Sequence, residues 1–344
     1  MRLVSSLTVA VLIVAAIACG CGTDLAQRTG KEDAYTVKPS NGGERRVLFV
    51  HHSCGSGLMR SGLVAALEDL RNPYSKGQYS FHEAEYGSHL GEGDGSLGRY
   101  TDQHDWYVKF REDLDRPGDL VDMLNCKHQD ETYTDGGENT IIMFKSCYPN
   151  SDVEAADTSI ELDDAAVRAA WLDPDQGGYY NGLWEEGVGG PINYIKAAYL
   201  GLLDIFRENP DRLFIAVTTP ALHYGSTNPE QAARARELND WLRTEWLKGY
   251  TDKNGRVNVA VFDWYAEHAY SDNPEDANYW RNFLGKPGHE ELTEENHSQR
   301  LNTLRLDYAS PDGNSHPNDP ANKRLVKVFV EQFIGLAYEA WRGG

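Results

Sequence analysis

Short apolar runs alternate with amphipathic stretches along most of the chain. Five apolar runs, each bounded by turn-forming residues, predict buried β-strands at 46–52, 79–86, 140–146, 213–219 and 257–263. Apolar residues at helical spacing predict helices at 57–70, 192–207, 229–248 and 322–341. Strands that alternate with helices indicate a parallel sheet covered on both faces. The pattern therefore predicts an α/β fold: a doubly wound three-layer α/β/α sandwich around a mostly parallel five-stranded sheet.

Two long stretches, 91–139 and 151–190, do not follow this alternation. Loops of this length in a compact domain are typically lids or binding walls, so we interpret both as insertions at strand ends rather than as separate domains. Their aromatic side chains suit two roles equally, as platforms for sugar rings or as packing onto the sheet. These aromatic residues are Trp106, Tyr107, Trp171, Tyr179, Tyr180 and Trp184.

Residues 1–20 have the pattern of an export signal. Arg2 precedes an uncharged, mostly apolar run that ends in Ala-Cys-Gly-Cys. The small residues before Cys19 and Cys21 resemble the lipobox of bacterial lipoproteins, which implies lipidation of one of these cysteines; a plain cleaved signal is the alternative. Residues 21–44 are polar and predict a flexible tether ahead of one domain at 45–344. We therefore expect an exported protein, either a cell-envelope lipoprotein or a secreted one.

Charge and cysteine content narrow the possible partners and cofactors. The 344 residues carry 33 Lys and Arg against 53 Asp and Glu, a formal net charge of −20. This excess repels phosphate backbones and anionic lipids, so we expect no nucleic-acid partner and membrane contact only through an N-terminal lipid anchor. Beyond the leader, an oxidising compartment would allow one disulfide among Cys54, Cys126 and Cys147, and the sequence does not select the pair. No Cys/His pair has zinc-ligand spacing, so we expect neither a metal ion nor another cofactor.

Polar side chains follow two of the predicted strands and precede the last predicted helix. Ser53 comes directly after the first strand, Asn150 comes after the third, and Asp312 and His316 lie just before the final helix. Ligands of open α/β sheets bind outside the carboxyl ends of the strands, so we expect these groups at one edge. A helix cap, a Pro-Asn turn and a polar turn would explain them separately. Together they form a set of nucleophile, amide donor and base.

This set, in this order, resembles the SGNH (GDSL-type) hydrolase superfamily. The resemblance implies that Ser53 is the nucleophile, His316 the general base and Asp312 the carboxylate that orients the base. It also implies an oxyanion hole formed by the Ser53 N–H, the Gly87 N–H and the Asn150 amide. Gly91 is the competing choice for the glycine. The resemblance covers residues 46–341 in topology, but its specific blocks are short.

Three features depart from the family pattern. His51-His52-Ser53 stands where the family has Gly-Asp-Ser, and Tyr148 stands where a glycine precedes the asparagine. Three residues, rather than two, separate Asp312 from His316, which re-aims the carboxylate relative to the imidazole. A backbone carbonyl or another carboxylate would then have to orient the base.

The resemblance implies an exported or lipid-anchored serine esterase without a cofactor. Its substrate would be a small-molecule or glycan ester, with acetyl groups on a carbohydrate as one candidate. A non-catalytic glycan-binding lipoprotein on the same scaffold and an acyltransferase are the alternatives. Cys54, next to Ser53, is a further candidate nucleophile, although a buried structural cysteine is the preferred interpretation. Adjacent strand residues point to opposite faces, so His51 and His52 are not expected to share a metal ion.

Overall fold

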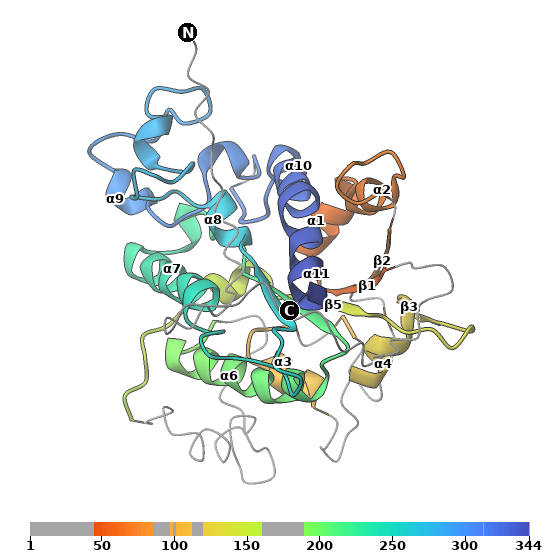
Figure 1. Ribbon diagram of the computed structural model, residues 1–344. Coiled ribbons are helices and arrows are strands. Elements are labelled where there is room, and N and C mark those ends of the chain that lie inside the picture. Colours follow the sequence, from red (N-terminus) through yellow and green to blue (C-terminus); the bar gives the residue numbers. More distant parts are fainter. Residues whose placement is uncertain are drawn as a thin grey trace, which may run out of the picture.

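The computed structural model describes residues 45–76, 78–85, 88, 97–98, 101–111, 120–159, 189–311 and 313–343. The predicted signal at 1–20 and most of the predicted insertion at 151–190 lie outside these ranges. The central sheet has the strand order β2-β1-β5-β6-β7, and all neighbouring strands are parallel. The predicted α/β sandwich with a five-stranded parallel sheet is thus confirmed (Figure 1). The strands are β1 (Arg45–Val50), β2 (Tyr79–Ala84), β5 (Ile141–Lys145), β6 (Leu213–Val217) and β7 (Val259–Phe262).

The strand order reverses between β1 and β5. From β1 the chain continues to β2 on one side, whereas β5, β6 and β7 extend the sheet on the other. In the register of the β1–β5 pair, Val50 lies opposite Phe144, so the two strands end at nearly the same level. The segments that follow these two strands begin with His51 and Ser146. They meet at the switch point, where open α/β sheets bind their ligands.

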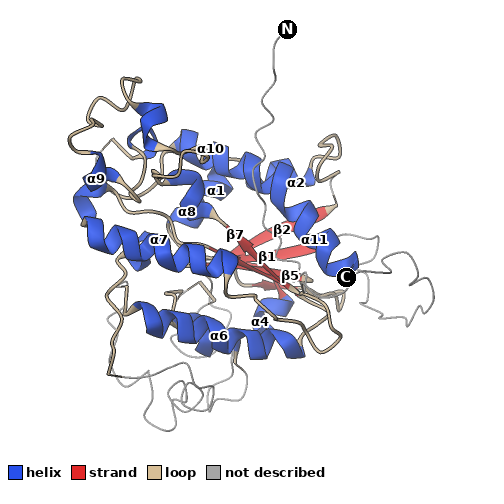
Figure 2. Ribbon diagram, turned by 60° about the vertical axis from the view of Figure 1, so that its left-hand side comes forward, coloured by secondary structure: helices blue, strands red, loops and turns tan. Residues whose placement is uncertain are grey.

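Among the described residues, four helices cover one face of the sheet: α3 (Asp105–Phe110), α4 (Leu120–Asn125), α6 (Ile192–Glu208) and α7 (Pro229–Thr244). Figure 2 shows α4 and α6 on one side of the strands and α2 and α11 on the other. The helical spacing of apolar residues in α6 places Phe206 on the sheet, where its ring stacks on Phe214 of β6 with centroids 4.0 Å apart. The helix predicted at 192–207 is present as α6, and the helix predicted at 229–248 is present as α7 but ends at Thr244.

The other face is covered by α1 (Cys54–Arg60), α2 (Leu63–Glu68), α10 (Asp319–Val328) and α11 (Ile334–Gly343). A π-helical turn at Phe329–Phe333 joins the last two into one long helical segment, as predicted at 322–341. The single helix predicted at 57–70 is wrong in one respect. Gly62 adopts φ 92°, a left-handed conformation that ends the first helix and starts the second.

The described parts of the insertion predicted at 91–139 pack onto the sheet. They form α3, α4 and a short hairpin of β3 (Cys126–His128) and β4 (Glu131–Thr132). Trp106 is fully buried against Phe144, and its ring N–H donates a hydrogen bond to Ser146 Oγ at 2.8 Å. Of the two roles left open for the aromatic residues, Trp106 therefore has the packing role. Trp171, Tyr179, Tyr180 and Trp184 lie outside the described residues.

The segment between β7 and α10 was not predicted to contain structure. It holds two short helices, α8 (Trp264–His268) and α9 (His297–Arg300), and two 3₁₀ turns, η4 (Trp280–Phe283) and η5 (Leu306–Tyr308). These surround a small separate core of Tyr270, Trp280, Phe283 and Leu292. In Figure 1 this segment lies beside α10, next to the end of the sheet where the parallel strands finish. Within the described ranges, no helix is long and apolar enough to cross a bilayer.

Candidate active site

Ser53 lies in a strained turn between β1 and α1. Its backbone has φ 49° and ψ −98°, a combination that residues with a side chain rarely adopt. Ser53 occupies the N-cap position of α1, yet its side chain makes no capping hydrogen bond. The turn therefore directs the hydroxyl away from the helix, and the capping role considered from the sequence does not explain the residue. Strain of this kind concentrates at functional sites.

Two glycines of α1 allow close packing around this turn. A Cβ on Gly55 would lie 2.3 Å from the imidazole of His51, and a Cβ on Gly57 would lie 2.7 Å from Asn322 Nδ2. Both distances are shorter than real Cβ contacts, so His51 or Asn322 would have to shift if either glycine carried a side chain. Gly57 lets α1 approach α10, and Asn322 of α10 donates to the carbonyl of Pro317 at 3.1 Å. This packing brings the start of α1 next to the loop that precedes α10.

The loop before α10 is held from several sides. The His223 backbone N–H donates to Ser315 Oγ at 3.0 Å, and Pro317 forms an isolated bridge with Ala309. Asn318 caps α10 by accepting from the Ala321 N–H at 3.1 Å. These contacts fix the backbone on both sides of His316.

Ser53 and His316 meet although 263 positions separate them. Ser53 Oγ lies 2.5 Å from His316 Nε2. Asn314 Oδ1 accepts from the His316 backbone N–H at 2.7 Å and lies 3.1 Å from Nδ1. An amide oxygen can only accept, so it selects the tautomer with the proton on Nδ1. Nε2 is then free to accept the Ser53 proton, and the three residues form a Ser-His-Asn set.

Asn314 is the site residue that sequence analysis missed. Asp312, the predicted orienting residue, lies outside the described residues, and Asn314 Oδ1 is the acceptor found at Nδ1. The signal was present in the sequence: an Asn two residues before His316 can accept its backbone N–H in an Asx turn. In this sequence the side chain bonds both to that N–H and to the ring.

Asn150 lies at the same edge, but its side-chain hydrogen bonds among the described residues do not go to this pair. It belongs to η1 (Tyr148–Ser151), which follows β5, and its side chain is buried. Its Oδ1 accepts from the Gln103 N–H at 2.6 Å, and its Nδ2 donates to Asp102 Oδ1 at 2.5 Å. These bonds fix the amide plane and use one of the two Nδ2 hydrogens, which leaves the other for a further acceptor.

The segment between β5 and Asn150 links Asn150 to the Ser53–His316 pair. Tyr148, which stands where the resembled family has glycine, packs against the imidazole of His316 with ring centroids 4.8 Å apart. The predicted glycine donor, Gly87, and its competitor Gly91 lie outside the described residues, as do the predicted lipidation sites Cys19 and Cys21.

The two histidines before Ser53 are weak proton acceptors, because both have a pKa below the ordinary value of a histidine. Burial lowers the pKa of His52 to about 4, with nearby Lys145 adding to the effect. Burial also lowers the pKa of His51, despite the hydrogen bond between its Nε2 and Glu83 at 2.9 Å. Both rings are therefore neutral at pH 7.

Two groups of side chains in the described ranges have the donor types of a metal site. In each, the three ligand atoms lie within 4.8 Å of one another. The first is His51, Glu83 and Glu85, under the Ser53 turn, and the second is Asp102, His104 and Asp105, beside Asn150. Hydrogen bonds already occupy part of each group, such as Ser56 Oγ to Glu85 at 2.7 Å.

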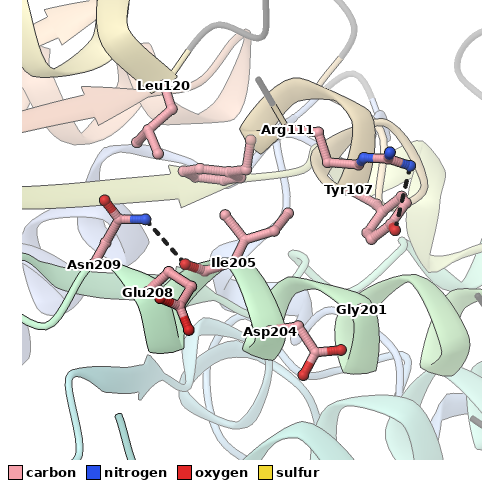
Figure 3. A pocket seen from close by; sticks show the side chains of 9 residues that line it. Tyr107, Arg111, Leu120, Gly201, Asp204, Ile205, Glu208 and Asn209 are labelled. Atoms are coloured by element: carbon pink, nitrogen blue, oxygen red, sulfur yellow. Dashed lines mark hydrogen bonds between the residues drawn. The ribbon is translucent and has the colours of Figure 1, made fainter. Parts of the chain in front are cut away.

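A separate hollow of about 340 Å³ lies between α3 and α6 (Figure 3). Apolar side chains such as Leu120 and Ile205 line it together with Arg111, Asp204 and Glu208. The Arg111 guanidinium points toward the Tyr107 hydroxyl, 3.4 Å away. Tyr107, one of the candidate sugar platforms, lines this hollow, but none of the predicted catalytic or oxyanion residues does, so we assign it no part in the chemistry at Ser53.

No protein-family model, curated protein or solved structure matches this chain.

Proposed function

We propose that this chain is an exported serine esterase that hydrolyses a small ester through a Ser53 acyl-enzyme. The observation that carries the proposal is the 2.5 Å contact between Ser53 Oγ and His316 Nε2. The strained Ser53 backbone and the Asn314 acceptor behind the imidazole support it. A serine that only capped α1 would need none of these three features.

The arrangement supports a two-step acyl transfer. His316 Nε2 takes the Ser53 proton as Oγ attacks the ester carbonyl, and the new oxyanion accepts hydrogen bonds from the Ser53 N–H and Asn150. The resemblance implies the Gly87 N–H as a further donor. Protonated His316 then gives its proton to the leaving alcohol, which leaves an ester on Ser53. In the second step His316 deprotonates a water, the water attacks the acyl carbon, and the acid leaves as Ser53 regains its proton.

Asn314, the residue that orients His316, distinguishes the Ser53-His316-Asn314 set from the family pattern. Asn314 holds the imidazole in the required tautomer, as a carboxylate would, but it is neutral. It therefore stabilises the imidazolium formed during catalysis less than a carboxylate would. We expect a lower turnover than for a set completed by an aspartate.

Covalent labelling tests the proposal directly. A fluorophosphonate probe is expected to label Ser53, and Ser53→Ala is expected to lower p-nitrophenyl acetate hydrolysis by about 10³-fold or more. Ser56→Ala is the matched control, because Ser56 lies one turn further along α1 and bonds Glu85 rather than His316. An unlabelled Ser53, with Ser53→Ala hydrolysing at the wild-type rate, would reject the esterase and favour the glycan-binding alternative.

The leader supports the location and the substrate class. The apolar run before Cys19 and Cys21 favours export and lipid anchoring, which would place the enzyme where acetylated carbohydrates are accessible. Release of acetate from acetylated glycans is therefore the first natural reaction to measure. Fatty-acid labelling of cells that express Cys19→Ser or Cys21→Ser tests the anchor, since only loss of the lipidated cysteine abolishes the label.

A further inference from the structure

Two thiols lie in contact directly beside Ser53. Cys54 begins α1, Cys147 follows β5, and both side chains are buried, with 3% and 1% of their surface exposed. The two side chains are hydrogen-bonded to each other. Both residues belong to the apolar core beneath α1 and α10, and both thiols are free. The shared core places the two side chains together beside the β1–β5 switch point.

Cys126 has a different environment. It packs in the core on the opposite face of the sheet, whereas Cys54 and Cys147 share the core beneath α1 and α10. Its thiol donates to the Gln129 carbonyl at 3.4 Å, and burial raises its pKa to about 12. The sheet separates Cys126 from the other two. Of the three pairings that the sequence allows, the structure therefore favours Cys54 with Cys147.

We propose that Cys54 and Cys147 form an intramolecular disulfide when the chain folds in the presence of an organic disulfide. The Cys147 thiolate attacks one sulfur of the organic disulfide, forms a mixed disulfide and releases one thiolate. Cys54 then loses its proton and attacks the Cys147 sulfur, which releases the second thiol. The two protein thiols are oxidised, and one organic disulfide is reduced to two thiols.

The surrounding charges fit this order of attack. Burial by itself would raise the pKa of Cys147, but the hydrogen bond from the Cys54 thiol, the Lys145 ammonium and His52 together lower it. Burial and the same thiol pair raise the pKa of Cys54. Cys147 is therefore the first nucleophile and Cys54 the resolving thiol. The bond would join the residue after Ser53 to the residue before η1, independently of whether Ser53 is catalytic.

Peptide mapping after thiol blocking tests the proposal. The full chain is produced in an oxidising compartment, denatured in N-ethylmaleimide and digested. The expected result is one disulfide-linked pair of peptides that contain Cys54 and Cys147, with Cys126 alkylated. Alkylation of both Cys54 and Cys147, or linkage of either one to a different cysteine, would overturn the proposal.

Thermal unfolding gives an independent measurement. Closing a loop of about ninety residues restricts the unfolded chain, so a reductant is expected to lower the melting temperature by about 5 °C. Cys126→Ser should keep this shift, and Cys147→Ser should abolish it. A shift that persists in Cys147→Ser, or that is absent from the wild type, contradicts the bond.

Discussion

The Ser53–His316 pair and the Asn150 amide lie at one edge of the sheet but are positioned by different parts of the chain. The Ser53–His316 pair is held by two helices that cover the sheet, because α1 and α10 pack closely at Gly57 and Asn322. Asn150 is oriented instead by Asp102 and Gln103, which belong to a predicted insertion. The scaffold thus brings nucleophile and base together, whereas the insertion sets the direction of the amide. Mutations in the insertion can therefore change the oxyanion donor and leave the pair intact.

The largest expected effect on turnover comes from removing the Asn150 amide, which should leave the Ser53–His316 pair reactive. Asn150→Ala is expected to lower kcat by about 10²-fold, because one oxyanion donor is lost, while fluorophosphonate labelling of Ser53 continues. Asn139→Ala is the matched control. Asn139 is also a buried asparagine held by backbone contacts, to the carbonyls of Met123 and Cys126 at 2.7 and 2.6 Å. A loss of activity per total protein in both variants, with kcat per folded molecule unchanged in Asn150→Ala, would mean that Asn150 acts only through stability.

A smaller effect on turnover is expected when the Asn150 amide remains but loses one of the hydrogen bonds that orient it. Asp102→Ala removes the acceptor of the Asn150 Nδ2 hydrogen bond, so the amide can rotate and kcat should fall about tenfold with little change in KM. Asp102→Asn keeps an acceptor oxygen in the same place and should retain most of the activity. Steady-state kinetics of the two variants measures the difference. If Asp102→Asn loses as much activity as Asp102→Ala, the carboxylate charge matters rather than the orientation of Asn150.

Apolar periodicity predicted the sheet and most of its covering helices because those elements bury continuous apolar runs. It did not predict the segment between β7 and α10, whose helices span only four or five residues. These short helices pack around scattered aromatic residues such as Tyr270 and Trp280 rather than along an apolar stripe. A periodic pattern needs several turns before it becomes recognisable.

The candidate site likewise contains residues that the sequence pattern indicated and residues that it did not. Ser53, Asn150 and His316 could be selected from the sequence because each stands at the end of a predicted strand or the start of a predicted helix. Their partners depend on turn geometry and on long-range packing, which composition and spacing do not encode. Asp102 was one of many acidic residues in a long insertion, and Asn314 was overlooked because the resemblance directed attention to Asp312.

Asn314, which orients His316, offers a specific test of the Ser53–His316 pair. Asn314→Asp preserves the acceptor for the His316 N–H and ring but adds a negative charge 3.1 Å from Nδ1. A carboxylate there stabilises the imidazolium that forms when His316 takes the Ser53 proton, so kcat for p-nitrophenyl acetate should rise a few-fold.

Steady-state kinetics measures this rise, with Asn296→Asp as the control that adds the same charge elsewhere. Asn296 accepts the N–H of Thr293, three residues before it, at 2.8 Å in the segment between β7 and α10. An equal rise of kcat in both variants would reflect net charge alone. A rise only in Asn314→Asp would show that the charge acts on His316 through position 314.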